Sequence, residues 1–578
     1  MNGINKILEI LPTKVKKKLY IFIFLLLIAS FFELVSISLL IPVAEIIING
    51  ETSISLINDF LGNYQKSFSQ NQILVYSLLF IICLFLIKTL YLIAFSYWTN
   101  KFSQNTYKIL SEKVLEKYLR KKYLFFINNK SSDLIRNIII ETKNVSAVIF
   151  SYLKIIVELF VFISIGIFIL VVDFKTSMSL IIFFLFFTFV YYFFTKKLIF
   201  NYGLIRQQST AKQLKNLQEI FGSIKDIKLK KSENFFKNFF VKYMKMFVKA
   251  AYISNTFNEA PRFLIELFFL IILTIIIMIN ISETQGVETI LPLLVVYLAA
   301  GLRLLPGFVK LNGYLQLVES NKASLNLIYK ELIAKEKEFR LNYENDKERK
   351  NNSDKLAMGD ITFQGISFSF GEKKIFKDFN LEIKKNSILG VSGKSGSGKS
   401  TLINLLLGLL EPRKGKILLN GLDTKNFLSD WQKRLGYVSQ NIFLLDASLK
   451  QNIAFGVDEE KIDYHQLNKV IKYANLSDLV ENLKDGLDTN IGEKGSKISG
   501  GQIQRIAIAR ELYRNPSILI LDEATTGLDH NNEKKIFDSI KELKNKMTVV
   551  IVSHNKDTIK ICDNLLDLDK KQFKDSFD

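Results

Sequence analysis

Residues 393–401 read Gly393-Lys394-Ser395-Gly396-Ser397-Gly398-Lys399-Ser400-Thr401. The apolar run at 387–391 before them predicts a buried strand, and the apolar run at 402–407 after them predicts the start of a helix. A strand, a glycine-rich loop ending in Gly-Lys-Ser and a helix form the setting that distinguishes a phosphate-binding loop from an ordinary glycine-rich turn. The whole stretch is therefore a candidate nucleotide-binding loop.

This loop predicts two kinds of phosphate contact. Its glycines let successive backbone N–H groups turn toward the phosphates, and the N-terminus of the following helix adds positive potential. We expect Lys399 to reach the β- and γ-phosphates and the Ser400 hydroxyl to bind Mg²⁺. A nucleotide and Mg²⁺ are therefore expected at this loop, and the family resemblance described below implies that the nucleotide is ATP.

The composition indicates several domains and a membrane part. The chain has 578 residues, and 49% of them are hydrophobic, including 48 Phe. The net charge of +21 fits either a nucleic-acid-binding protein or a membrane protein with basic cytoplasmic loops. The two cysteines, Cys83 and Cys562, lack neighbours at metal-ligand spacing, so we expect neither a disulfide nor a metal site there.

Six apolar segments are each near or above the roughly 20 residues that cross a bilayer. They are about 19–47, 73–97, 148–172, 177–195, 261–281 and 287–312. The connections 98–147 and 196–260 are long and rich in lysine, whereas the other connections are short and carry few basic residues. This asymmetry predicts a multi-pass protein of the bacterial inner (plasma) membrane with both termini in the cytoplasm. Since the basic residues flank spans, nucleic acid is not an expected partner.

The two lysine-rich connections are predicted to be helical excursions into the cytoplasm, because they are long and contain few Gly or Pro. A short transverse helix is expected at each tip, at about 123–130 and 217–224, where it can contact a cytoplasmic motor. Ordinary solvated linkers are the alternative. We expect a polar helix at 313–340, a transmembrane domain over 1–335 and a charged linker at 336–358.

Residues 359–578 alternate between predicted strands and helices, which indicates an α/β domain. An apolar strand at 517–521 leads into Asp522 and Glu523. We expect Asp522 to hold Mg²⁺ through water and Glu523 to act as general base on the attacking water. Gln440 follows another strand and is a further candidate ligand of Mg²⁺ that can touch the same water. Solvated acids at a strand end are the alternative.

Two further stretches are candidate phosphate contacts. Ser499, Gly500, Gly501 and Gln502 open a helix predicted at 503–513, and small residues at a helix start favour anion binding. His554 follows a strand at 548–552 and is a candidate contact to the γ-phosphate. A lone histidine is more often structural, but the other two, His465 and His530, do not follow a buried strand.

In order and spacing, these stretches resemble the nucleotide-binding domain of ATP-binding cassette (ABC) proteins. The motifs occur here in the same order as in that family. They are the phosphate loop, Gln440, the signature at 498–502, the carboxylates at 518–523, the loop at 526–529 and His554. The resemblance implies an ATPase with a P-loop NTPase fold and a helical subdomain. Phe370 stands where an adenine-stacking Tyr is usual, and Ile498 stands where Leu is usual.

Six spans followed by one cassette resemble the type I ABC exporter architecture, in which a membrane all-α domain precedes the ATPase domain. That resemblance implies a homodimer, in which the signature of one subunit faces the phosphate loop of the other across bound ATP. The stretch 490–495 matches the one by which exporter cassettes sense the membrane half.

Three basic residues in or beside the spans are candidates for a substrate cavity: Lys88, Arg262 and Arg303. A charge inside a bilayer costs about 2.5–3.5 kcal/mol on insertion, so it is a functional candidate by default. The alternative for Lys88 and Arg262 is snorkelling to an interface or pairing with Glu158 or Glu266. Basic residues on several spans suggest a substrate with an anionic head group. The outer connection at 49–72 suggests a short amphipathic helix on the outer leaflet.

The membrane half resembles PglK-type flippases of lipid-linked oligosaccharides at 32–38, 260–262, 303–306 and 324–329. That resemblance implies ATP-driven transfer of a polyprenyl-pyrophosphate glycan, a lipid-linked anionic substrate, from the inner to the outer leaflet. The alternatives are a general lipid or multidrug exporter and a peptide exporter. Peptide exporters often carry an N-terminal peptidase domain with a catalytic Cys and His, and the first 18 residues contain neither.

Overall fold

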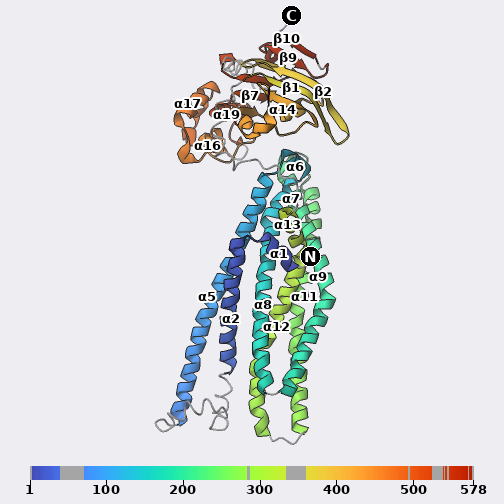
Figure 1. Cartoon of the computed structure of the whole chain (residues 1–578), viewed down its shortest axis with the longest axis vertical. Helices are drawn as coiled ribbons and strands as arrows, with labels where there is room; N and C mark the ends of the chain where they lie inside the picture. Colours follow the sequence, from blue (N-terminus) through green and yellow to red (C-terminus); the bar gives the residue numbers. More distant parts are fainter. Residues whose placement is uncertain are drawn as a thin grey trace. The chain divides into compact units, whose positions relative to one another are not determined.

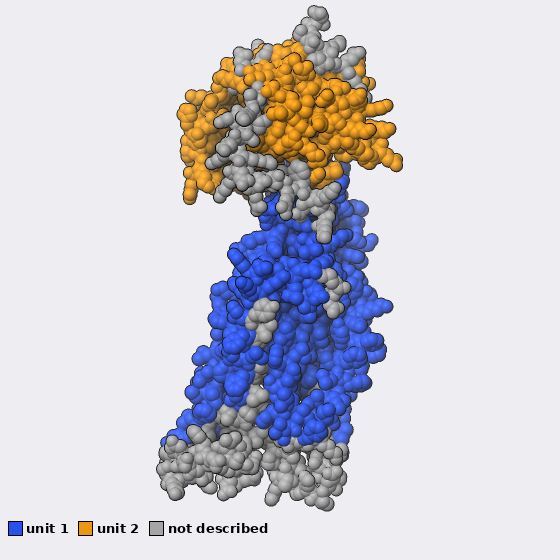
Figure 2. Space-filling model, in the orientation of Figure 1, with its two compact units in different colours: residues 1–121, 126–338 blue, residues 122–125, 339–578 orange. Residues whose placement is uncertain are grey.

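The computed structural model divides the chain into two compact units (Figure 2). Residues 1–121 and 126–338 form the first unit, and residues 122–125 and 339–578 form the second. The described residues are 3–38, 70–172, 174–282, 287–333, 359–492, 495–523, 538, 541–542, 546–570 and 572–575. Three predicted segments lie wholly or mostly outside the described residues: the outer helix at 49–72, the linker at 336–358 and the loop at 526–529.

The described residues between 3 and 333 form both long and short helices (Figure 1). They are α1 Gly3–Ile10, α2 Thr13–Ser38, α5 Gln70–Leu119, α6 Tyr123–Asn128, α7 Ser131–Arg136, the π-helix η1 Asn137–Glu141, α8 Thr142–Val172, α9 Phe174–Gly222, α10 Ile224–Leu229, α11 Glu233–Ser282, α12 Val287–Ser320 and α13 Lys322–Ile333. The six predicted spans fall on α2, α5, α8, α9, α11 and α12, apart from the end of the first span, which lies outside the described residues.

These helices extend well beyond a bilayer. α5 and α11 have 50 residues each, so each is about 75 Å long at 1.5 Å per residue, against a hydrocarbon core of about 30 Å. Within the described part of the chain, three helical stretches are long and apolar enough to cross a membrane: Leu78–Leu119, Ser131–Val171 and Ser177–Gly222. Large apolar side chains on them are exposed, such as Leu90, Ile167 and Phe189, as expected of surfaces that face lipid.

The structure corrects the position of the second short helix. The sequence predicted it at 217–224, but α9 continues to Gly222, and the short helix α10 runs from Ile224 to Leu229. The break is at Ser223, whose backbone leaves the helical region, so the Gly-Ser pair ends the long helix and precedes the short one. At the first tip, α6 occupies Tyr123–Asn128, at the start of the predicted 123–130.

The predicted polar helix at 313–340 is also interrupted. α12 ends at Ser320 and α13 begins at Lys322, with a turn at Asn321. The Asn321 side chain accepts a hydrogen bond from Arg206 of α9 at 2.9 Å, which ties the turn to a neighbouring helix. The sequence pattern remains helical on both sides, so tertiary contacts such as this one mark the break.

A buried ionic cluster joins η1 to α9. The Glu141 side chain is 1% exposed, and its carboxylate lies 3.1 Å from Arg136 Nε and accepts a hydrogen bond of 2.9 Å from Gln207 Nε2. A buried carboxylate is stable only with such partners. The cluster therefore fixes the π-helix against the long helix, and sequence reasoning did not predict it.

The second unit is built on two sheets (Figure 1). An antiparallel sheet has the order β2-β1-β4-β5, and a largely parallel sheet has the order β10-β9-β3-β8-β7-β6. The strands are β1 Ile361–Phe370, β2 Lys373–Ile383, β3 Ile388–Ser392, β4 Lys414–Leu419, β5 Leu422–Asp423, β6 Leu435–Val438, β7 Ile518–Asp522, β8 Thr548–Val552, β9 Asn564–Asp567 and β10 Gln572–Asp575. The strands predicted at 387–391, 517–521 and 548–552 are thus confirmed as β3, β7 and β8, the first two shifted by one residue.

The parallel sheet is buried on both faces, which explains why its central strands are continuous apolar runs. One face packs with the antiparallel sheet and α14 (Lys399–Leu406), through residues such as Phe363, Leu402 and Ile520. The other face packs against α16 (Leu449–Ile453), α17 (Tyr464–Tyr473) and α19 (Gly500–Tyr513). β3, β7 and β8 are therefore held rigidly, and so are the loops that leave their carboxyl ends.

Trp431 provides a test of this core. It is fully buried, and its indole N–H donates to the Leu406 carbonyl at the end of α14 at 2.8 Å. We expect Trp431→Ala to lower the free energy of unfolding of this domain by about 3–5 kcal/mol, and Trp431→Phe by ~1 kcal/mol through loss of the hydrogen bond. Thermal or urea denaturation of the full-length chain in detergent measures this. Phe443→Ala, at an exposed side chain, is the control, and equal melting temperatures for Trp431→Ala and the control would contradict the assignment.

Candidate ATP site and membrane cavities

The glycine-rich loop leaves β3 and ends as the first turn of α14. Gly398 precedes the helix with φ of 106°, a left-handed conformation in which a side chain is strained. A Cβ at Gly398 would also lie 3.0 Å from Ile375, so glycine is required on two grounds. The Ser397 hydroxyl is buried within the loop and makes no hydrogen bond. An unpaired buried hydroxyl in a loop of this kind fits a site that donates to phosphate oxygens.

Lys399, His554 and Glu523 come together from three elements. Lys399 Nζ donates to the Gly393 carbonyl at 2.5 Å and lies 3.0 Å from His554 Nε2. The same His554 nitrogen lies 3.3 Å from Glu523 Oε1. The structure therefore places the candidate phosphate-binding lysine, the candidate phosphate-contacting histidine and the candidate general base side by side.

Glu523 is held in an unusual conformation directly after β7. Its φ of +51° is left-handed, which is uncommon for a residue with a side chain and tends to occur at functional sites. Its backbone N–H donates to the Val552 carbonyl of β8 at 3.0 Å, and its Oε2 accepts from Gln440 Nε2 at 2.5 Å. The predicted partners Gln440 and Glu523 are thus in direct contact.

Asp522 is half-buried at the end of β7, and its Oδ2 accepts a hydrogen bond from the Tyr437 hydroxyl at 3.1 Å. Burial raises the pKa of Asp522, and the charge of Glu523 acts in the same direction, while the Tyr437 hydrogen bond and the charge of Lys399 act against it. Burial, followed by the charge of Asp522, raises the pKa of Tyr437, so the phenol is protonated at neutral pH and donates.

The donor set fits Mg²⁺. The described residues contain no group of three or more His, Cys, Asp or Glu side chains that could enclose a metal ion. The oxygen donors at this site are Ser400, Gln440 and Asp522, which is the small set of hard ligands that suits a Mg²⁺ ion shared with nucleotide phosphates. The buried, unpaired Ser397 hydroxyl beside them indicates a place for those phosphates.

The second candidate anion contact is the start of α19. Ser499 is the N-cap, and Ser499 and Gln502 form a reciprocal capping box, with hydrogen bonds of 2.8 and 3.3 Å. The helix begins at Gly500, three residues before the predicted start, because this box satisfies the first N–H groups. Gly500 and Gly501 therefore form its exposed first turn. The stretch 490–495, which was predicted to sense the membrane half, is described except for residues 493 and 494.

Phe370 lies at the end of β1. Its side chain is 40% exposed, and its ring packs edge-on against Phe368 at 5.0 Å between centroids. The exposed ring face is suited to stacking on a planar base.

Comparison with known proteins identifies both halves of the chain. The family described as "ABC transporter" matches residues 376–526, and the family "ABC transporter transmembrane region" matches residues 19–299. The chain belongs to the ABC transporters. It carries their ATPase domain after an exporter-type transmembrane region, as the sequence motifs indicated.

Curated relatives match this ABC transporter chain over part of their length. An "ATP-dependent lipid A-core flippase" of Francisella novicida is 35% identical over 252 residues, 43% of this chain and 42% of the relative. A flippase of the same name from Ralstonia nicotianae is 38% identical over 37% of each chain. "ABC transporter B family member 17" of Arabidopsis thaliana is 37% identical over 38% of this chain and 18% of the relative. The chain thus spans less than half the length of these relatives.

A solved structure matches nearly the whole chain. It is described as "Structure of a bacterial Atm1-family ABC exporter with ATP bound", and the TM-score is 0.75 over 96% of this chain and 94% of that one. At 19% identity this likeness shows the fold alone. The predicted fold, a helical membrane domain followed by a P-loop NTPase domain, is confirmed.

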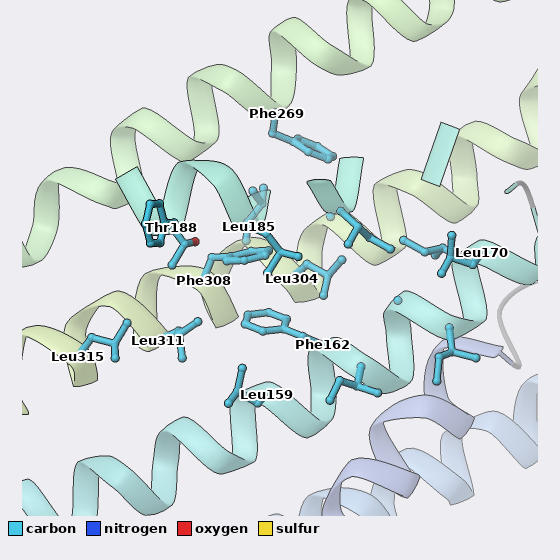
Figure 3. A pocket seen from close by; sticks show the side chains of 18 of the residues that line it. Leu159, Phe162, Leu170, Leu185, Thr188, Phe269, Leu304, Phe308, Leu311 and Leu315 are labelled. Carbon is cyan, nitrogen blue, oxygen red and sulfur yellow. The ribbon is translucent and has the colours of Figure 1, made fainter. Parts of the chain in front are cut away.

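The transmembrane region of this ABC transporter contains an apolar cavity of about 560 Å³ (Figure 3). Side chains of α8, α9, α11 and α12 line it, among them Phe162, Thr188, Phe269 and Phe308. Thr188 Oγ1 is buried and makes no hydrogen bond, although other helical threonines of the chain, such as Thr195, bond the carbonyl four residues earlier. The cavity lining is thus hydrocarbon-like, and the polar side chains in it are Thr188 and Tyr192.

A second cavity, of about 440 Å³, lies between α11 and α12 and is basic. It is lined by Arg262, Ile265, Glu266, Leu305, Pro306, Val309 and Lys310. Arg262 Nε lies 3.1 Å from Glu266 Oε1, which is the pairing considered as the alternative to a substrate role. Sequence reasoning missed Lys310, although a charge inside the predicted span 287–312 was a sufficient signal.

The three predicted cavity residues are not gathered in one place within this chain. Lys88 lies on α5, which packs with α2 and α8, whereas Arg262 lies on α11, which packs with α9 and α12. Lys88 Nζ is 5.0 Å from the centre of the Phe85 ring, a cation–π contact. Arg303 lies within α12, and its side chain is outside the described residues.

Glu523→Gln tests the active site. The amide keeps the shape and the Gln440 contact but cannot accept a proton, so we expect ATP hydrolysis to fall by about 10²-fold or more with ATP binding retained. ATPase rate and nucleotide binding, measured on the same purified sample, check this. Glu382→Gln removes a carboxylate from an exposed pair with Lys384 and is the matched control. Normal turnover in Glu523→Gln would place the base elsewhere.

Proposed function

We propose that this ABC transporter uses ATP hydrolysis to move an anionic lipid from the inner to the outer leaflet of the bacterial inner membrane. The observation that carries the proposal is the pair of cavities along α12, one apolar and one basic, which meet at Leu305. An amphiphile with a hydrocarbon chain and a negative head group matches that pair. The two flippase relatives, which are named for lipid A-core transport, support a lipid substrate.

The proposed chemistry follows from the contacts at the ATP site. Lys399 and the loop amides bind the β- and γ-phosphates, and Glu523 takes a proton from the attacking water. Gln440, which already contacts Glu523, orients that water, and His554 binds the γ-phosphate. Ser400, Gln440 and Asp522 would hold Mg²⁺, which supplies charge neutralisation at the phosphates when bound.

We further propose that two copies of the chain form the transporter. The chain carries one phosphate loop and one signature, at 393–401 and 498–502. Ser499, Gly500, Gly501 and Gln502 of each subunit would contact ATP held by the loop of the other, with Phe370 stacking on adenine. Both termini would lie in the cytoplasm. The short helices α6 and α10 would contact the ATPase domains.

The narrower proposal for the substrate is a lipid-linked oligosaccharide with a pyrophosphate head. It rests on the local resemblance to PglK-type flippases at 260–262 and 303–306. Pro306, in the second stretch, lines the basic cavity. A general lipid or multidrug exporter is the second candidate, and the almost wholly apolar lining of the larger cavity favours it. A peptide exporter is the third.

Reconstitution into liposomes separates these candidates. The purified chain is assayed for ATPase stimulation and for ATP-dependent translocation with a polyprenyl-pyrophosphate saccharide, lipid A and an apolar drug. Stimulation by the saccharide lipid supports the narrow proposal. A response to lipid A alone supports a lipid flippase of another specificity, and a response only to the drug would overturn the anionic-lipid proposal.

Neutralising the basic residues tests the substrate path. We expect the triple change of Lys88, Arg262 and Arg303 to Gln to reduce lipid translocation at least about tenfold while basal ATPase changes less than about twofold, because each lost charge contact to an anion is worth about 1.5–3 kcal/mol. The control changes three exposed lysines of α11 to Gln: Lys237, Lys245 and Lys249. Equal translocation by the two triple variants would remove the first set from the path.

A further inference from the structure

Tyr437 connects two parts of the ATPase domain through two hydrogen bonds. Its hydroxyl donates to Asp522 Oδ2 at 3.1 Å, and its backbone N–H donates to Glu511 Oε2 at 3.1 Å. Tyr437 lies on β6, opposite Ile520 of β7 in a parallel pair, so its side chain is held beside the end of β7. The function proposed above gives this residue no role.

The Glu511 contact has a structural cause. β6 is the last strand in the order of its sheet, with β7 on one side, so N–H groups that point away from β7 need another acceptor. Glu511, on α19, supplies it. Gly436 allows the helix to come this close, because a Cβ there would lie 3.2 Å from Glu511 Cβ.

α19 carries both the signature and this contact. It begins at Gly500, directly after Ser499, and runs to Tyr513, so Glu511 lies on the same continuous helix about 16 Å along the axis from Gly500. A helix of this length moves as one body. A displacement of the signature therefore reaches the Tyr437 backbone through Glu511.

We propose that Tyr437 is a positioning residue for Asp522, and that Glu511 ties its position to the signature helix. The proposal deepens the proposed function and rests on it for the roles of Asp522 and of the signature. With Oδ2 held by the phenol, the carboxylate has one orientation, in which Asp522 would hold the metal ion through its water. Movement of α19 when the second subunit docks would then alter the metal-binding carboxylate of the same chain, which links the two ATP sites of a dimer.

Tyr437→Phe tests the positioning role in the full-length, reconstituted chain. The ring and the backbone bond to Glu511 remain, and only the hydroxyl is lost. We expect the Mg²⁺ concentration for half-maximal ATPase to rise about tenfold, which is about 1.4 kcal/mol, because the carboxylate loses the hydrogen bond that orients it. The maximal rate at saturating Mg²⁺ should change less than about twofold, and Mg²⁺-free ATP binding should stay unchanged. Mn²⁺ binding followed by electron paramagnetic resonance, with a non-hydrolysable ATP analogue, should weaken in parallel.

Tyr513→Phe is the matched control. The Tyr513 hydroxyl accepts a hydrogen bond from the Asp463 N–H at 2.8 Å at the end of α19 away from the signature, so its loss removes one phenol contact without touching the site. Its metal dependence should equal that of the unaltered chain. Glu511→Gln keeps an acceptor and should behave like the unaltered chain, whereas Glu511→Leu should show the Tyr437→Phe defect.

Unchanged Mn²⁺ affinity and unchanged Mg²⁺ dependence in Tyr437→Phe would overturn the positioning role. If Tyr437→Phe has the metal-binding defect but Glu511→Leu keeps unchanged Mn²⁺ affinity and Mg²⁺ dependence, the link to the signature helix would be overturned. Failure of the proposed function can be distinguished from failure of this proposal. If the unaltered chain does not hydrolyse ATP, Mn²⁺ binding to it and to the variants can still be measured.

Discussion

The parallel pairing of β3, β8, β7 and β6 is the constraint on which the ATP site depends. Carboxyl ends of parallel strands meet at one edge of a sheet, and loops that leave this edge converge. Four distant parts of the chain are joined in this way by a series of contacts, from Lys399 to His554, from His554 to Glu523 and from Glu523 to Gln440. The apolar strand cores, buried on both faces, keep that edge rigid.

The site also concentrates local strain and close polar contacts. Glu523 has a left-handed backbone, which costs free energy and persists because its N–H is fixed to β8 and its carboxylate to Gln440. Asp522 beside it is fixed to Tyr437. Two adjacent carboxylates therefore keep different surroundings, one beside a histidine and an amide and one beside a phenol. This difference suits one to proton transfer and the other to metal binding.

In the membrane region, one helix carries most of the chemistry. α12 contributes Leu304, Phe308 and Leu311 to the apolar cavity and Pro306 and Lys310 to the basic one, on different sides of the same helix. The turn at Asn321, directly after the end of α12, is hydrogen-bonded to Arg206. Because α12 borders both cavities, it is well placed to respond to a bound substrate, in line with the proposed function.

The sequence by itself determined the two-part fold and the choice of candidate ATP-site residues, because glycine-rich turns, strand-end carboxylates and apolar periodicity are local properties of the chain. Only the tertiary structure decided that α10 follows the break at Ser223, that α12 ends at Ser320, and that Glu141 is buried with Arg136. The same holds for the partners of Tyr437 and for the separation of Lys88 from Arg262. These features depend on contacts between distant segments, which no local pattern encodes.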